Sequence, residues 1–65
     1  MIIKWTNKYS GETGYVASVS HKEGHFVSTD DINKAKSYSS KTISNIIKDL
    51  IEYGEGENNN FEIVE

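Results

Sequence analysis

An apolar stripe in the second half of the chain constrains the fold most. Its five members stand at relative positions 0, 3, 4, 7 and 8, and they are Ile43, Ile46, Ile47, Leu50 and Ile51. This spacing matches the 3.6-residue period of an α-helix that buries one face. Ser39 or Ser40 can cap the first turn, and Gly54 stands where many helices end in a left-handed conformation. The pattern predicts an amphipathic helix over residues 41–53 that must pack on another apolar surface.

The residues before the stripe predict that this other surface is a β-sheet. Residues 2–7, 14–20 and 25–28 are rich in β-branched and aromatic side chains that alternate with polar ones. Such alternation is typical of half-buried strands. Short segments that contain glycine separate the three runs, so they predict an antiparallel meander.

Strict alternation further predicts which side chains share a face of the sheet. In the first strand it places Ile3 and Trp5 together. In the second strand it places Tyr15 and Val19 on the face opposite Val16, because successive side chains of a regular strand point to opposite sides. One helix is then expected to cover one face of this sheet.

The end of the chain supplies one more strand. Residues 61–65 alternate in the same way, residues 54–60 form a polar, glycine-rich flexible loop, and residues 31–35 form a short capped turn before the helix. The predicted class is α+β, with the order β-β-β-α-β: an antiparallel meander, one helix laid on the sheet as a single layer, and a C-terminal strand. Residues 1–65 form a single domain. A right-handed crossover is favoured for the connection through the helix.

Length and composition limit the chemistry that the chain can perform. It has 65 residues and no cysteine, which excludes disulfides, thiolate zinc sites and thiol catalysis and leaves little room for a deep enzyme cleft. Neither the phosphate-loop nor the dinucleotide-binding glycine pattern occurs. We therefore expect no enzymatic activity and no cofactor.

Two small groups of polar residues have a metal-binding interpretation and a simpler one. His21 and His25 bracket the turn after the second strand, and Asp30 and Asp31 precede the short turn. The histidines have no evident third strong ligand, and an aspartate in that place caps a turn or complements its dipole. We expect no metal site and interpret the aspartates as caps.

The hydrophobic segments are too short for a bilayer. None approaches the roughly 20 consecutive apolar residues that a membrane span requires, and the N-terminal residues read as a strand rather than as a signal peptide. We expect a cytoplasmic protein with no membrane contact.

Charge and aromatic residues suggest where a partner would bind. Residues 1–48 contain all seven lysines and four acids, whereas residues 49–65 contain six acids and no base, so the two parts carry net charges of +3 and −6. The aromatic residues exceed what so small a core needs, which leaves some for a surface. The candidate partner surface consists of Trp5, Tyr9, Glu52, Glu55, Glu57 and Glu62.

A second group of residues offers an alternative function. Lys34, Lys36 and Lys41 surround Tyr38, and lysines beside an aromatic ring can grip phosphates and stack on bases. The chain contains no arginine, and its pI is about 5.3, which is far from the basic character of most nucleic-acid-binding domains. Weak nucleic-acid binding is therefore the alternative to protein binding.

The central segment also resembles a known group of proteins. Its residues follow the pattern Thr-x-Asp-Ile-x-Lys-Ala-x-x-Tyr/Phe-x-Ser/Thr through Thr29, Asp31, Ile32, Lys34, Ala35, Tyr38 and Ser40, and the chain ends in Glu62-Ile-Val-Glu65. With a hairpin before it and a helix after it, this segment resembles small phage and prophage proteins of Gram-positive bacteria. The resemblance covers roughly the last two-thirds of the chain in pattern. The group has no established common activity, so no residue role is carried over.

The resemblance implies a factor that binds and modulates a host protein. Taken with the residues, it leads us to expect a non-enzymatic protein that acts by protein–protein contact, with a host protein or with a second copy in a homodimer.

Overall fold

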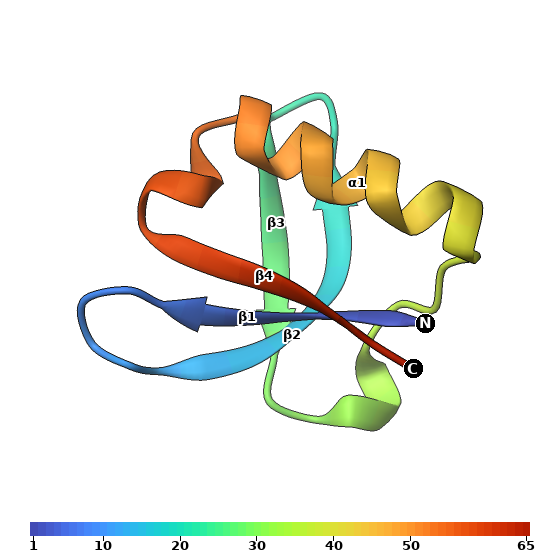
Figure 1. Cartoon of the computed structure of the whole chain (residues 1–65), viewed down its shortest axis with the longest axis horizontal. Helices are drawn as coiled ribbons and strands as arrows, with labels where there is room; N and C mark the ends of the chain where they lie inside the picture. The colour runs from blue at the N-terminus through green and yellow to red at the C-terminus, as the bar shows by residue number, and fades with distance from the viewer.

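A four-stranded antiparallel sheet and one helix make up the fold, which is α+β as predicted (Figure 1). The computed structural model describes all residues, Met1–Glu65. The elements in chain order are β1 (Ile2–Asn7), β2 (Thr13–Ser20), β3 (His25–Thr29), the 3-10 turn η1 (Ile32–Lys34), α1 (Ser40–Glu52), the 3-10 turn η2 (Glu55–Glu57) and β4 (Asn59–Val64). The predicted order β-β-β-α-β is confirmed.

The first strand lies inside the sheet, and the last strand pairs with it. The strand order is β3-β2-β1-β4, so β3 and β4 form the two edges. The β1–β4 pairing is regular from Ile2 opposite Val64 to Asn7 opposite Asn59. Every neighbouring pair is antiparallel, so β3 and β4 run in opposite directions. The crossover rule applies to parallel strands and therefore does not govern the connection through α1.

A β-bulge in β2 changes which residues face the helix. Val16 pairs with Ser28 and Ser18 pairs with Val27, so β2 has one extra residue between these pairs. Val16 is fully buried, and Val19 packs against the same core. The predicted placement of Val16 and Val19 on opposite faces is wrong, because the extra residue shifts the alternation by one. The bend of β2 is visible in Figure 1.

The core lies between α1 and the centre of the sheet. Its fully buried side chains are Ile3, Val16, Ile43 and Leu50. At about 100° per residue, Ile43 and Leu50 lie within about 20° of each other on the helix surface, whereas Ile51 lies about 100° from Leu50. Ile51 is accordingly 56% exposed. Its predicted place in the core is wrong, because it stands at the margin of the apolar stripe.

Local polar contacts begin and end the helical segments as the sequence indicates. The Ser39 hydroxyl accepts a hydrogen bond from the Thr42 N–H at 3.2 Å, and a carboxylate oxygen of Asp31 accepts one from the Asn33 N–H at 2.9 Å. Both residues are thus caps. Gly54 has a φ of 90° just after α1. No helix of the structure is both long and apolar enough to cross a membrane.

The segment over residues 54–60 has regular structure. It contains η2 and the first residues of β4, which begins at Asn59, two residues before the predicted start. The Asn59 side-chain amide donates a hydrogen bond to the Glu55 carbonyl oxygen at 3.1 Å. The flexibility predicted for this segment stays a prediction.

Candidate functional site

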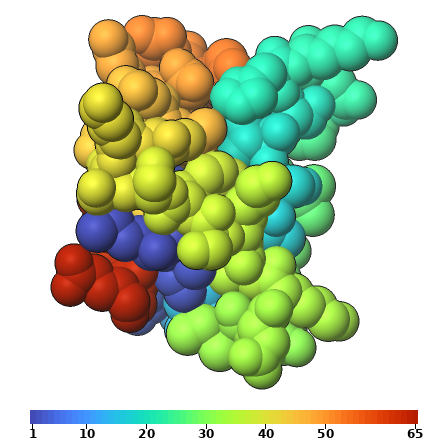
Figure 2. Space-filling view, turned by 90° about the vertical axis from the view of Figure 1, so that its right-hand side faces the viewer, coloured from blue at the N-terminus to red at the C-terminus, as the bar shows by residue number.

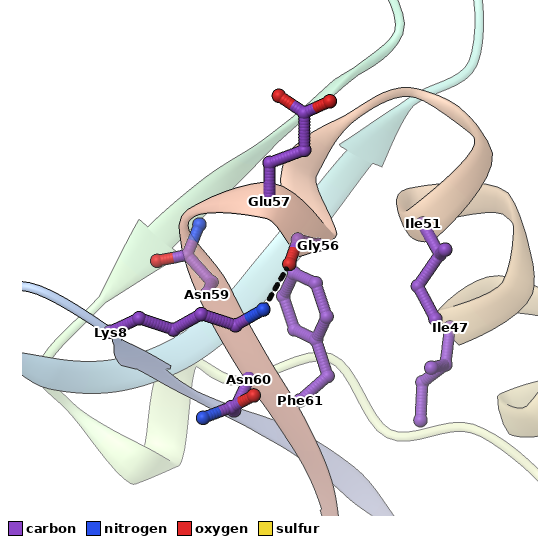
Figure 3. A pocket seen from close by; sticks show the side chains of 8 residues that line it. All are labelled: Lys8, Ile47, Ile51, Gly56, Glu57, Asn59, Asn60 and Phe61. Carbon is purple, nitrogen blue, oxygen red and sulfur yellow. Dashed lines mark hydrogen bonds between the residues drawn. The ribbon is translucent and has the colours of Figure 1, made fainter.

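An open groove lies between the C-terminal half of α1 and the start of β4 (Figure 3). Its volume is about 480 Å³. Ile47 and Ile51 form one side, and Phe61 lies across from them. The remaining lining is polar and comes from Lys8, Gly56, Glu57, Asn59 and Asn60. The groove therefore has apolar walls and a polar border.

The helix margin and an aromatic contact explain why these walls exist. Ile51 projects from the side of α1 beyond the buried stripe, so the sheet does not cover it. Phe61 pairs with Trp5 across β1 and β4, and its ring meets Phe26 edge to face with centroids 5.6 Å apart. Contacts with Trp5 and Phe26 therefore hold the Phe61 ring in place, and the ring also lines the groove.

A side-chain hydrogen bond fixes the polar end of the groove. The Lys8 ammonium donates to the Gly56 carbonyl oxygen at 2.7 Å, the dashed line of Figure 3. The Lys8 backbone N–H donates to the Asn58 carbonyl oxygen, also at 2.7 Å. The turn after β1 is thus tied to η2, and the cation at the groove is already engaged.

Acidic residues stand at the border of the groove and next to it in the sequence. Glu57 lines it, and Glu52 and Glu55 are the sequence neighbours of the lining residues Ile51 and Gly56. The ion pairs of the structure join other residues. None of these three carboxylates forms a salt bridge, and Lys8, the cation that lines the groove, donates to the Gly56 carbonyl oxygen instead.

The predicted partner residues do not form one surface. Glu57 lines the groove, whereas Glu52, the last residue of α1, and Glu55, the first residue of η2, are only neighbours in sequence of its lining residues. Glu62 lies on the sheet face away from α1, where its carboxylate is 3.9 Å from the Lys4 ammonium. Tyr9 is 81% exposed in the turn between β1 and β2.

Trp5 is the predicted partner residue whose position differs most from the expectation. It is partly buried and packs against the core. Its indole lies over Gly14, and its Nε1 is buried without a hydrogen-bond partner. Trp5 therefore contributes to packing rather than to an exposed surface.

The candidate partner surface predicted from the sequence does not include the apolar groove residues. These residues are Ile47, Ile51 and Phe61. Their apolar character assigned them to the core. The exposure of Ile51 could have been predicted from the sequence, because its angle on the helix places it at the margin of the apolar stripe. The position of Phe61 opposite α1 depends on the pairing of β4 with β1, which the sequence pattern does not specify.

In the predicted nucleic-acid patch the lysines are exposed, whereas the tyrosine ring is packed against the core. Lys34, Lys36 and Lys41 are exposed, and the segment that carries them runs over the face shown in Figure 2 in green to yellow. Tyr38 packs against the core, and burial raises the pKa of its hydroxyl. Its ring is therefore only partly available for stacking on a base.

The two histidines have separate partners. His21 Nδ1 lies 2.9 Å from the Tyr53 hydroxyl oxygen, whereas His25 Nε2 lies 2.7 Å from a Glu23 carboxylate oxygen. The structure has no group of three or more histidine, aspartate or glutamate side chains placed to hold a metal ion.

Comparison of the chain with protein-family models, with curated proteins and with solved structures finds no match.

Proposed function

We propose that this chain is a non-enzymatic, cytoplasmic protein that binds another protein through the groove between α1 and β4. The observation that carries the proposal is the groove itself: the exposed Ile51 and the partly buried Ile47 and Phe61 form its apolar walls, and Glu57 lines it without a salt bridge. An apolar centre with a polar border is typical of protein contact surfaces. The volume of about 480 Å³ is large enough to receive an anchoring side chain of a partner.

The proposed partner is a host protein with positive charge near an apolar anchor. The resemblance to phage and prophage proteins supports a host protein, and the carboxylates of Glu52, Glu55 and Glu57 would attract basic residues and speed association. Homodimerisation stays a prediction from the sequence.

Affinity capture from a Gram-positive bacterial lysate, quantified by mass spectrometry, tests the proposal. The test variant is Ile51→Ser and its matched control is Ile32→Ser, because these isoleucines are 56% and 50% exposed and belong to different elements. Loss of an anchor contact of about 2 kcal/mol would reduce capture by Ile51→Ser roughly 30-fold. Ile32→Ser should capture the same proteins as the unmodified chain. Equal capture by both variants would overturn the proposal.

The charge of the border is tested separately in the same assay. A triple change of Glu52, Glu55 and Glu57 to glutamine should weaken capture and reduce its salt dependence, because the attraction to a basic partner is lost. Glu62→Gln is the control, since Glu62 lies on the other face of the sheet beside Lys4. Undiminished capture by the triple variant would show that the acidic border has no role.

A further inference from the structure

The outer edge of β4 has free backbone hydrogen-bonding groups beside the groove. The Lys8 N–H bonds to the Asn58 carbonyl oxygen in the same register as the β1–β4 pairs. In an antiparallel ladder, residues that bond to the neighbouring strand alternate with residues that do not. Every second residue after Asn58 therefore bonds to β1. The backbone N–H and C=O groups of Phe61 and Ile63 therefore face outward from the free edge of the sheet, on the side opposite β1.

This edge has few of the features that usually prevent strand addition. Natural edge strands are protected by charged side chains, especially lysine, or by proline, bulges or a covering segment. The residues of β4 include neither lysine nor proline, and its pairing with β1 shows no register shift. Its one charged residue, Glu62, lies on the face away from α1 beside Lys4. β3 differs, because it is five residues long and its pairing with β2 is bulged. β4 is the better template for another strand.

The side chains beside this edge are apolar on the helix side. Ile63 pairs with Ile3 and Phe61 pairs with Trp5, so both lie on the face that α1 covers. Ile63 is 43% exposed and Ile51 is 56% exposed. A strand added next to β4 would place every second side chain against this apolar margin, with one of them in the groove.

Charge selects the kind of strand that would fit. Residues 49–65 carry six acids and no base. A second copy of β4 would bring the same acids to the edge, and like charges on adjacent strands are destabilising. A segment with lysine or arginine at its polar positions would instead be attracted to this end of the molecule.

We infer that the β4 edge and the groove form one docking site for an extended segment of a partner, in which apolar and basic residues alternate and which adds a fifth strand to the sheet. This inference rests on the proposed protein-binding function and specifies its geometry. The backbone of the segment pairs with Phe61 and Ile63, and one apolar side chain occupies the groove.

The direct test is a nuclear magnetic resonance titration of the full chain with an end-blocked nonapeptide that alternates lysine and valine. At about 1 mM peptide, the amide signals of Phe61 and Ile63 should shift. Hydrogen exchange at these two amides should slow at least about tenfold, because pairing protects them from water. A peptide that alternates glutamate and valine is the charge control and should cause neither change.

Two substitutions at Ile63 isolate the backbone contribution. Ile63→Pro removes an N–H that faces outward, so the bonds to β1 remain. Ile63→Ala removes a similar amount of side chain and keeps the N–H. Binding should fall at least about tenfold more for Ile63→Pro than for Ile63→Ala. Circular dichroism on both variants identifies any loss of fold.

Several results would overturn the inference. These are equal binding by Ile63→Pro and Ile63→Ala, equal binding of the acidic peptide, no signal shifts, or shifts centred on another face. Light scattering that shows a dimer, with the exchange-protected amides in β4, would assign the edge to a second copy instead.

The capture assay distinguishes a failure of this inference from a failure of the protein-binding function on which it rests. Capture that Ile51→Ser abolishes and Ile63→Pro leaves intact would retain the protein-binding function and overturn strand addition. Capture that survives Ile51→Ser would overturn the function itself.

Discussion

His21 Nδ1 lies 2.9 Å from the hydroxyl oxygen of Tyr53, and the two rings meet edge to face with centroids 6.1 Å apart. Tyr53 is the residue that follows the last turn of α1, and His21 belongs to the turn between β2 and β3. An Asp49 carboxylate oxygen lies 3.9 Å from the same imidazole nitrogen. This contact attaches the end of α1 to the half of the sheet that lies farther from the groove.

The His21–Tyr53 hydrogen bond should make a measurable contribution to stability. Tyr53→Phe deletes the hydroxyl and keeps the ring, so the free energy of unfolding should fall by about 1 kcal/mol. In a chain of this size that corresponds to a decrease in Tm of roughly 4–8 °C in a thermal melt. Tyr9→Phe is the control, because Tyr9 is 81% exposed. Identical melts for the two variants would show that the bond contributes nothing.

The close contact between Gly14 and Trp5 predicts a severe effect for a small substitution. A Cβ at position 14 would lie 2.9 Å from both Cζ2 and Nε1 of Trp5. Gly14→Ala should therefore displace the indole and lower the free energy of unfolding by about 1–3 kcal/mol. The tryptophan fluorescence spectrum should change as well. Ser18→Ala, at an exposed position of the same strand, should alter neither quantity.

Features set by neighbouring residues could be predicted from the sequence. The cap of α1 depends on Ser39 and Thr42, which are three residues apart, and the Asp31 cap depends on Asn33. The alternation in residues 2–7 predicts β1 with its exact bounds. In each case the deciding contacts or patterns lie within one turn or one strand.

Features set by distant residues could not be predicted in the same way. The bulge between Val16 and Ser18 depends on the pairing of β2 with β3, and the alternation within β2 gives no sign of it. The groove depends on β4 pairing with β1 and on the Lys8–Gly56 hydrogen bond, which joins residues 48 positions apart. Of the residues that line the groove, the sequence therefore marked only Glu57.

The two neighbours Leu50 and Ile51 should respond very differently to truncation. Leu50 is fully buried, whereas Ile51 is 56% exposed. Leu50→Ala should cost about 2–5 kcal/mol of unfolding free energy, because it leaves a cavity in the core. Ile51→Ala should cost less than about 1 kcal/mol. Urea unfolding followed by circular dichroism measures both, and similar costs would contradict the division between core and groove.

The nucleic-acid alternative predicts a salt-sensitive gel shift with oligonucleotides, which protein binding does not predict. If Lys34, Lys36 and Lys41 grip phosphates, a gel shift with single-stranded and duplex oligonucleotides should weaken sharply as salt rises. Changing all three to glutamine should abolish that shift. We expect no shift at all for the unmodified chain near physiological salt, since Tyr38 is packed and the chain is acidic. A retarded band that the triple variant loses would favour the alternative.

Tyr38 predicts how the fold responds to alkaline pH. Burial raises the pKa of its hydroxyl above the ordinary value of 10.0, so the folded chain holds this proton more tightly than the unfolded chain does. The resulting stability is fully present below the pKa of the unfolded chain and is lost as pH rises through the pKa of the folded one. Between about pH 9 and 11, Tm should therefore fall more steeply for the unmodified protein than for Tyr38→Phe. Parallel curves for the unmodified protein and Tyr38→Phe would contradict the assignment to Tyr38.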